Sequence, residues 1–394
     1  MGWASRRTFL AQAGAGLALS GCLSSVAKDH LAVFDAMWKT VEEWFFDPAM
    51  NGIDWRAVRR EWRPRAAGAE TPAALYLDVL FPVLDQLRSS HVDLRPPGAV
   101  LELTSGRGFG LPRQKRGGPF FMISPEDEAG MGAVLTWNGS AYVVEDVVAG
   151  GPAHDAGLQP GQLVRMISFQ YPKTGRQMNL VDGHGRTFTV TWSPKAAALP
   201  TELSVLERGV RRLKFGVFDQ RSVDWTIDAL GAAEGRPMVL DLRQNSGGLI
   251  VEMARLLSVL LPPGSELGLF RSRKRDYRPV TRLMPTSFHG PLAVLLGPRT
   301  ASAGEITASV LQHHGRARLF GAPTSASVLV SQRFDLPDGG KLTLPFTDYL
   351  TPSGTRIEGL GVKPDVAAAR TAFSMANGSD PALDAALDWL RHRQ

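Results

Sequence analysis

The feature that most constrains this chain is a buried-looking strand that runs into a turn of small residues carrying a serine. The apolar run Leu292–Leu296 is followed by Gly-Pro-Arg-Thr-Ala-Ser-Ala-Gly at 297–304, and then by an amphipathic stretch from Glu305 to His313. A strand end fixes the backbone, small neighbours leave room for a substrate, and a helix N-terminus supplies unpaired N–H groups. Helix capping produces the same pattern. From this segment alone, Ser302 could therefore be either a catalytic nucleophile or the N-cap of a helix.

A second strand ends in a glycine-rich turn. Met-Val-Leu-Asp-Leu at 238–242 precedes Arg-Gln-Asn-Ser-Gly-Gly at 243–248, and a helical pattern follows as far as Leu260. Paired glycines let backbone N–H groups approach a ligand closely, as an oxyanion hole requires. The alternative is a flexible turn with no role in binding.

Together the two segments resemble the core of the carboxyl-terminal processing (tail-specific) serine proteases. In that family L-D-L-R-x-N-x-G-G precedes T-A-S-A-x-E-I, and the same order holds here. Further matching elements are Gly321–Thr324, Tyr349–Gly354 and Glu358–Asp365, so the resemblance runs from about Leu31 to Asp365. It implies an α/β multidomain protein with a catalytic core of β-β-α units, similar to the crotonase and Clp-protease folds.

The resemblance implies that Ser302 is the nucleophile and that the N–H groups of Gly247 and Ala303 form the oxyanion hole. The larger branch of the family activates its serine with a lysine, but this chain has Ser327 at that position. No lysine occurs between Lys274 and Lys341. Because a serine hydroxyl is a poor nucleophile without an adjacent base, the usual serine–lysine mechanism is in doubt.

Another base is available in Ser90-His91, which resembles the Ser-His element of the tricorn-type branch. By the same match, the glutamate of that branch falls at Glu358, which would act through Ser90 to hold the imidazole tautomer. Histidine suits the role because its ordinary pKa lies near neutrality. The alternatives are a helix-end histidine at an interface and a glutamate in a solvated turn.

The N-terminus resembles an export signal. Arg6-Arg7 precede a short, mildly apolar segment that is too rich in glycine and alanine to make a good membrane span. Leu-Ser-Gly-Cys ends at Cys22 and resembles a bacterial lipobox, which implies a lipoprotein-type signal at 1–21 and a lipid on Cys22. Cleavage at a nearby small residue, with Cys22 lost or idle, is the alternative. We expect an exported protein of the periplasm or cell envelope.

Hydrophobic periodicity divides the rest of the chain into four regions. Helical periodicity predicts a helical domain over 28–97, alternating strands and helices predict the catalytic core over 198–372, and an amphipathic pattern predicts a C-terminal helix over 380–392. Between the first two, short strands with glycine punctuation predict a β domain over 105–195.

The β domain resembles a PDZ domain, because Gly150–Leu158 and the following Pro-Gly match that family's signature. A PDZ domain binds a peptide C-terminus by strand addition and cradles its carboxylate on backbone N–H groups. The loop that would do so is Gly132, Ala133 and Val134, or alternatively 108–111. The domain could instead only brace the core.

Composition and residue spacing argue against some classes of function. Hydrophobic content of 44% and charged content of 21% are those of a soluble globular protein, and the arginines behind the net charge of +6 are mostly scattered. We therefore expect no nucleic-acid partner. The histidines lack the spacing of zinc ligands, so no metal or cofactor is expected, and the single cysteine allows no intrachain disulfide.

These observations predict an exported serine endopeptidase that cleaves proteins or peptides near their C-termini, with a membrane contact only through a lipid on Cys22. A catalytically silent peptide-binding protein is the main alternative, because the lysine is missing. A hydratase or acyl transferase is a third, which the PDZ-like domain and the export signal disfavour.

Overall fold

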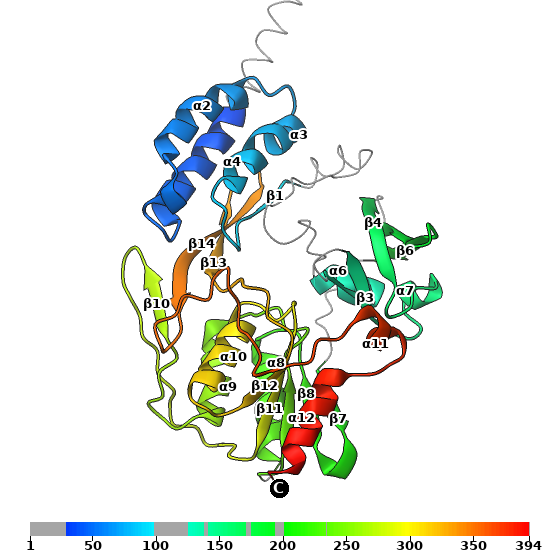
Figure 1. Cartoon of the computed structure of the whole chain (residues 1–394). Helices are drawn as coiled ribbons and strands as arrows, with labels where there is room; N and C mark the ends of the chain where they lie inside the picture. Colours follow the sequence, from blue (N-terminus) through cyan, green and yellow to red (C-terminus); the bar gives the residue numbers. More distant parts are fainter. Residues whose placement is uncertain are drawn as a thin grey trace, which may run out of the picture. The chain divides into compact units, whose positions relative to one another are not determined.

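The computed structural model describes residues 29–97, 125–137, 141–170, 175–193, 201–233 and 235–393, which fall into two compact units (Figure 1). The first unit comprises Met1–Thr104 with Ser331–Phe346, and the second comprises Ser105–Val330 with Thr347–Gln394. The signal segment 1–21, Cys22 and the alternative carboxylate loop 108–111 lie outside the described residues. No helix in the described ranges has the length and apolar character needed to cross a membrane.

The first unit is mainly helical, as the periodicity predicts. Two of its helices begin at side-chain caps: Asp54 accepts the N–H of Ala57, and Thr71 accepts the N–H of Ala74. The helical elements are a helix over 29–44, η1 (Met50–Gly52), α2 (Trp55–Ala67), α3 (Pro72–Ala74), the π-helix η2 (Leu75–Leu80) and α4 (Phe81–Asp85).

A segment from far along the chain completes the first unit. Residues 331–346, which the sequence pattern assigns to the catalytic core, belong instead to this unit. Leu336, Leu342 and Leu344 are buried in the same apolar cluster as the helices, because the helices alone leave an apolar face to cover. The strands are β1 (Asp93–Arg95), β13 (Val330–Asp335) and the first part of β14 (Lys341–Leu350), with β1 antiparallel to β14.

The first part of the second unit is an antiparallel sheet in the order β2-β3-β4-β5-β6. Alternating side chains such as Met178, Leu180 and Val190 are buried against two short helices. The elements are α6 (Pro125–Met131), β2 (Ala133–Trp137), β3 (Tyr142–Val147), α7 (Pro152–Asp155), β4 (Leu163–Gln170), β5 (Arg176–Asp182) and β6 (Thr187–Trp192).

The rest of the second unit is built on a six-stranded sheet in the order β15-β12-β11-β9-β8-β7, parallel except for the β7–β8 pair. A mixed α/β core is therefore confirmed, while its likeness to the crotonase fold stays a prediction. The strands are β7 (Glu202–Val205), β8 (Arg211–Lys214), β9 (Met238–Asp241), β11 (Leu292–Leu296), β12 (Arg318–Gly321) and β15 (Val366–Ala367). Outside this sheet, β10 (Leu269–Ser272) pairs with the end of β14.

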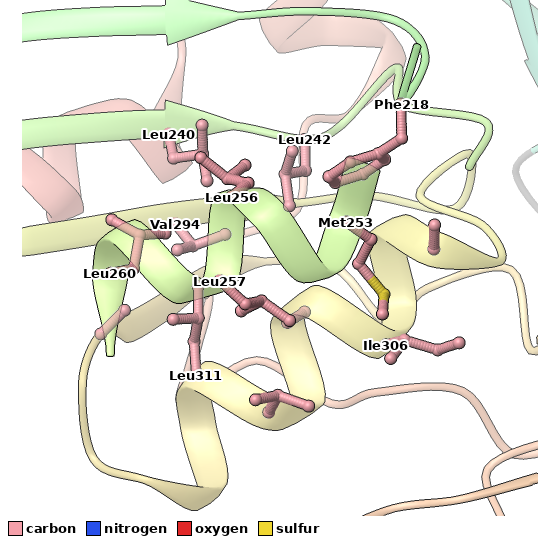
Figure 2. Packing of buried hydrophobic residues seen from close by; sticks show 14 of the residues in the cluster. Phe218, Leu240, Leu242, Met253, Leu256, Leu257, Leu260, Val294, Ile306 and Leu311 are labelled. Carbon is pink, nitrogen blue, oxygen red and sulfur yellow. The ribbon is translucent and has the colours of Figure 1, made fainter. Parts of the chain in front are cut away.

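Helices cover both faces of this sheet, so its central strands are apolar on both sides. On one face, Leu240 and Val294 pack with Met253, Leu257 and neighbouring residues of α9 and α10 (Figure 2). On the other face, alternate residues of the same strands pack against α12. The helical elements are η3 (Glu207–Gly209), α8 (Gln220–Gly231), α9 (Ile250–Leu260), α10 (Ala303–His313), α11 (Ala372–Ala376) and α12 (Pro381–Arg391). The predicted C-terminal helix is α12.

Candidate active site

Ser302 lies where strand β11 passes into helix α10. The strand is buried along its whole length, and α10 begins at Ala303. Ser302 has φ 52° and ψ −120°, a conformation that costs a residue with a side chain about 1–3 kcal/mol. Such strain persists only where the surrounding structure fixes the turn, and a strained strand-to-helix turn is one way of presenting a nucleophilic hydroxyl.

Gly247 lies directly against the serine. A Cβ added at Gly247 would come 2.5 Å from Ser302 Cβ and 3.1 Å from its Oγ, and the φ of Gly247 is +99°. Both space and backbone conformation therefore require glycine here. The Gly247 N–H donates to Asn245 Oδ1 at 3.0 Å, whereas Ala303, as the first residue of α10, has no acceptor for its N–H within the helix.

The two turns are joined because β9 and β11 are neighbouring parallel strands. Thr300 Oγ1 donates to the carbonyl of Leu242 at 2.8 Å, and the N–H of Ala301 donates to the carbonyl of Asn245 at 3.0 Å. Asn245 is itself fully buried and donates through Nδ2 to the carbonyl of Phe215. These bonds hold the glycine turn and the serine turn as one element.

Glu305 is a buried carboxylate that contacts the Ser302 turn, and the sequence assigns it only to the start of a helix. It accepts the N–H groups of Ser302 (3.2 Å), Ala326 (2.8 Å) and Ser327 (2.8 Å), and the hydroxyl of Thr324 (2.5 Å). Burial raises the pKa of Glu305 to about 7, against the four hydrogen bonds, which favour the ionised form. Its spacing of three from Ser302 is that of a capping box and is the signal that could have revealed it.

The loop at 324–328 takes the place of the missing lysine. The carbonyl of Ser327 accepts the N–H of Ser302 at 2.8 Å, so this position does lie beside Ser302. A serine hydroxyl cannot act as a base at neutral pH. Glu358 follows strand β14 in the chain and contacts the end of this loop, where its Oε2 accepts the N–H of Val328 at 2.9 Å.

Ser90 and His91 belong to the first unit, between α4 and β1. The Ser90 hydroxyl and His91 Nδ1 are 2.8 Å apart, and His91 has a positive φ of 59°. Burial lowers the pKa of His91 to about 4. The ring is therefore neutral at physiological pH, as a general base must be.

The predicted peptide-binding residues lie at the start of β2. In the described part of the chain β2 pairs with β3 alone, so it is an edge strand. The N–H of Gly132 already donates to the carbonyl of Glu128, and its carbonyl accepts the N–H of Val148. Arg299, three residues before Ser302, donates to the carbonyl of Leu135 at 2.8 Å and also to the carboxylate of Glu128. Ala133 and Val134 follow Gly132 in this strand.

Known families match two parts of the chain. The sequence profile of peptidase family S41 matches residues 213–368, and that of the tricorn protease C1 domain matches residues 27–80. The chloroplastic carboxyl-terminal-processing peptidase 2 of Arabidopsis thaliana is 26% identical over 375 residues, covering 86% of this chain and 69% of that protein. The carboxyl-terminal-processing protease of Synechocystis sp. is 27% identical over 386 residues, covering 90% and 85%.

Solved structures share the fold. The photosystem II D1 C-terminal processing protease matches with a TM-score of 0.60 at 21% identity, covering 90% of this chain and 98% of that one. Mature CPAF matches with a TM-score of 0.59 at 11% identity, covering 93% and 96%. The tricorn protease matches with a TM-score of 0.53 at 18% identity, covering 92% of this chain and 36% of that one.

A strained serine at a strand–helix turn, with a glycine turn packed against it, is an arrangement typical of serine hydrolases. Residues 213–368 thus form a domain of the peptidase family S41 type, and the protein is a serine peptidase. Within the described ranges, His, Cys, Asp and Glu side chains form no group of three or more that could hold a metal ion.

Proposed function

We propose that the protein is an exported endopeptidase that cleaves proteins or peptides near their C-termini, using Ser302 as nucleophile. The observation that carries this proposal is the strained Ser302 turn with Gly247 packed against the hydroxyl. The relatives from Arabidopsis thaliana and Synechocystis sp. are named for carboxyl-terminal processing, which supports the substrate class.

In the proposed mechanism, His91 Nε2 takes the proton from Ser302 Oγ as the hydroxyl attacks the peptide carbonyl, and then gives it to the leaving amine. Nδ1–H donates to Ser90, and Glu358 acts through Ser90 to hold this tautomer. The Ser90 hydroxyl lies 2.8 Å from His91 Nδ1, within the distance that this hydrogen bond requires. The match to the tricorn C1 domain over residues 27–80 supports the choice of branch.

The oxyanion of the tetrahedral intermediate is held by the N–H groups of Ala303 and Gly247. The Ala303 N–H is available as the first donor of α10. The Gly247 N–H must first exchange its bond to Asn245 Oδ1 for one to the substrate oxygen. Catalytic hydrogen bonds often form fully only when substrate is bound, and this exchange would be one of them.

The five-stranded β domain is proposed to be a PDZ domain that delivers the substrate's C-terminus. A peptide would add along the edge of β2 and place its carboxylate at Gly132, Ala133 and Val134. Delivery raises the effective concentration of the substrate at the catalytic turn. The twin-arginine signal would direct export of the protein to the periplasm or cell envelope. A lipid on Cys22 would anchor it there.

Two measurements test this function. A fluorophosphonate probe should label the wild-type protein and leave the Ser302→Ala variant unlabelled. A peptide with an apolar C-terminus and a free carboxylate should be cleaved several-fold faster than its C-terminal amide. Equal rates for acid and amide would contradict delivery by the carboxylate without touching the role of Ser302.

A catalytically silent peptide-binding protein is the second candidate, and Ser327 at the lysine position favours it. It requires that no base reaches Ser302. Absence of fluorophosphonate labelling in a folded wild-type protein that still binds free-acid peptides would establish this candidate and refute the peptidase mechanism.

A further inference from the structure

A cavity of about 820 Å³ lies in the second unit, at the opposite end of strand β11 from the serine turn. Leu292, the first residue of β11, lines it, together with the start of β12 and the end of α12. Figure 1 shows α12 alongside these strands, and its side chains pack on them. The volume is within the range of small-molecule sites.

The wall of this cavity carries only positive or titratable basic charge. Its polar side chains include three arginines and two histidines, with no aspartate or glutamate: His289, Arg316, Arg318, His392 and Arg393. Among the described residues, no carboxylate forms an ion pair with any of the three arginines. Three arginines thus line one cavity, and among the described residues no carboxylate lines it with them.

Arg316 is held in the cavity wall by neutral groups. Its Nε donates to the carbonyl of Leu260 and its Nη2 to the carbonyl of Phe288, both at 2.7 Å, which leaves Nη1 as the donor for a ligand. Burial lowers the pKa of Arg316. By contrast, the buried Arg243 is paired with Asp241 at 2.6 Å and Asp380 at 2.7 Å. A half-buried cation without a carboxylate is costly, and a bound anion would remove that cost.

Trp389 adds a second observation in the same wall. The guanidinium of Arg393 lies over its ring, 4.9 Å from the centroid, which positions that cation at the cavity. The indole Nε1 of Trp389 is buried and has no hydrogen-bond partner among the described residues. Because an indole N–H can only donate, a residue of the cavity wall keeps a buried donor without an acceptor there.

Helix ends explain part of this charge. Basic residues are favourable at helix C-termini, and Arg316 bonds the last residue of α9, Leu260. His392 and Arg393 directly follow α12. Arg318, however, begins strand β12, is exposed, and has no polar partner among the described residues. Helix capping therefore does not account for the full set.

We propose that this cavity binds a phosphate-bearing ligand, with the phosphate oxygens on Arg316, Arg318 and Arg393. A phosphate carries up to two negative charges and three acceptor oxygens, which suits several guanidinium groups at once. A single carboxylate would leave most of the positive charge unpaired. The site is independent of the proposed peptidase function. The phosphate group could belong to a soluble compound or to the headgroup of an anionic lipid.

The test uses the full-length protein with inorganic phosphate as the probe, at constant ionic strength set with NaCl. Calorimetry and thermal denaturation should show binding and a rise in Tm that chloride does not produce. The double variant Arg318→Gln/Arg393→Gln should weaken phosphate binding by about tenfold or more, the effect of losing a charged hydrogen bond. Arg221→Gln, at an exposed arginine of α8 outside the cavity, is the matched control.

Vesicles distinguish the two sources of phosphate. If phosphatidylglycerol vesicles sediment the wild-type protein, phosphatidylcholine vesicles do not, and the double variant loses binding, the ligand is a lipid headgroup. If phosphate binds but neither vesicle does, the ligand is a soluble phosphate compound. Absence of binding to phosphate and to both vesicles, or equal binding by the double variant and the wild type, would overturn the proposal.

Discussion

The two ends of strand β11 show opposite electrostatic situations. At its C-terminal end, the buried carboxylate of Glu305 receives four hydrogen bonds, including one from the backbone of Ser302. At its N-terminal end, the half-buried Arg316 donates to two carbonyls and has no carboxylate partner among the described residues. The first arrangement is satisfied within the protein, whereas the second is the one that we propose a phosphate-bearing ligand completes.

The difference shows how a parallel sheet separates two tasks. The turns that follow β9 and β11 lie side by side, so the sheet brings Gly247 to Ser302 and fixes both with short hydrogen bonds. The turns that precede the strands meet the ends of the helices, where cations are favoured. The proposed catalytic turn and the proposed phosphate site can therefore share one strand without sharing a residue.

The largest expected effect is at the serine. Ser302→Ala should lower kcat/KM for a cleaved peptide by about 10³-fold or more, because the nucleophile is lost while oxyanion donors and binding remain. Phosphate binding at the other end of β11 should not change. Ser309→Ala, which removes a buried hydroxyl from the same helix, is the matched control. Wild-type activity in Ser302→Ala would end the assignment of the nucleophile.

The next effect concerns the base. His91→Ala should lower kcat/KM by about 10²–10⁴-fold, the usual contribution of a positioned base, with the fold unchanged by circular dichroism. His313→Ala, at an exposed histidine of α10, should behave like the wild type. If both variants keep full activity, the base is some other group and the tricorn-like mechanism is wrong.

Glu305 should give the protein its pH dependence near neutrality. With a pKa of about 7 for Glu305 and about 4 for His91, acidification protonates Glu305 first and weakens its hold on the Ser302 turn. The acid limb of kcat/KM should therefore lie near pH 7. Glu305→Gln should lower activity at pH 8 by about tenfold, because an amide cannot accept all four bonds, and should move the limb toward pH 4. A limb that stays near pH 7 in the variant would show that another group titrates there.

The raised pKa of Glu305 also predicts how the free energy of unfolding depends on pH. A folded pKa raised from 4.5 to about 7 means that the folded protein holds the proton more tightly than the unfolded chain. Glu305 thus contributes stability that is fully present below pH 4.5 and is lost as pH rises through 7, by about 3 kcal/mol. Chemical denaturation should show this loss in the wild type and not in Glu305→Gln. A parallel pH dependence in both proteins would contradict the raised pKa.

Features that lie within one contiguous segment can be predicted from the sequence, whereas contacts between distant segments cannot. Ser302, the glycine turn and α10 lie in two contiguous motifs, so their pairing follows from the order of strands and turns. The donors to Glu305 at 324–327 lie about twenty residues downstream, and only the folded loop brings them to the carboxylate. Residues 331–346 join the first unit because its helices need an apolar cover, which periodicity does not reveal. The cations of the cavity come from three separate segments and form no motif.

The smallest expected effect is the most direct test of the contrast between the two ends of β11. Arg318→Gln/Arg393→Gln should leave peptide hydrolysis within about twofold of the wild type, because surface substitutions far from a rigid site rarely change its geometry. Saturating phosphate should likewise leave kcat/KM unchanged in both proteins. If phosphate changes the rate in the wild type and not in the variant, a ligand at one end of β11 alters the serine turn at the other. The two sites would then be coupled by a free energy that the ratio of the two rates measures.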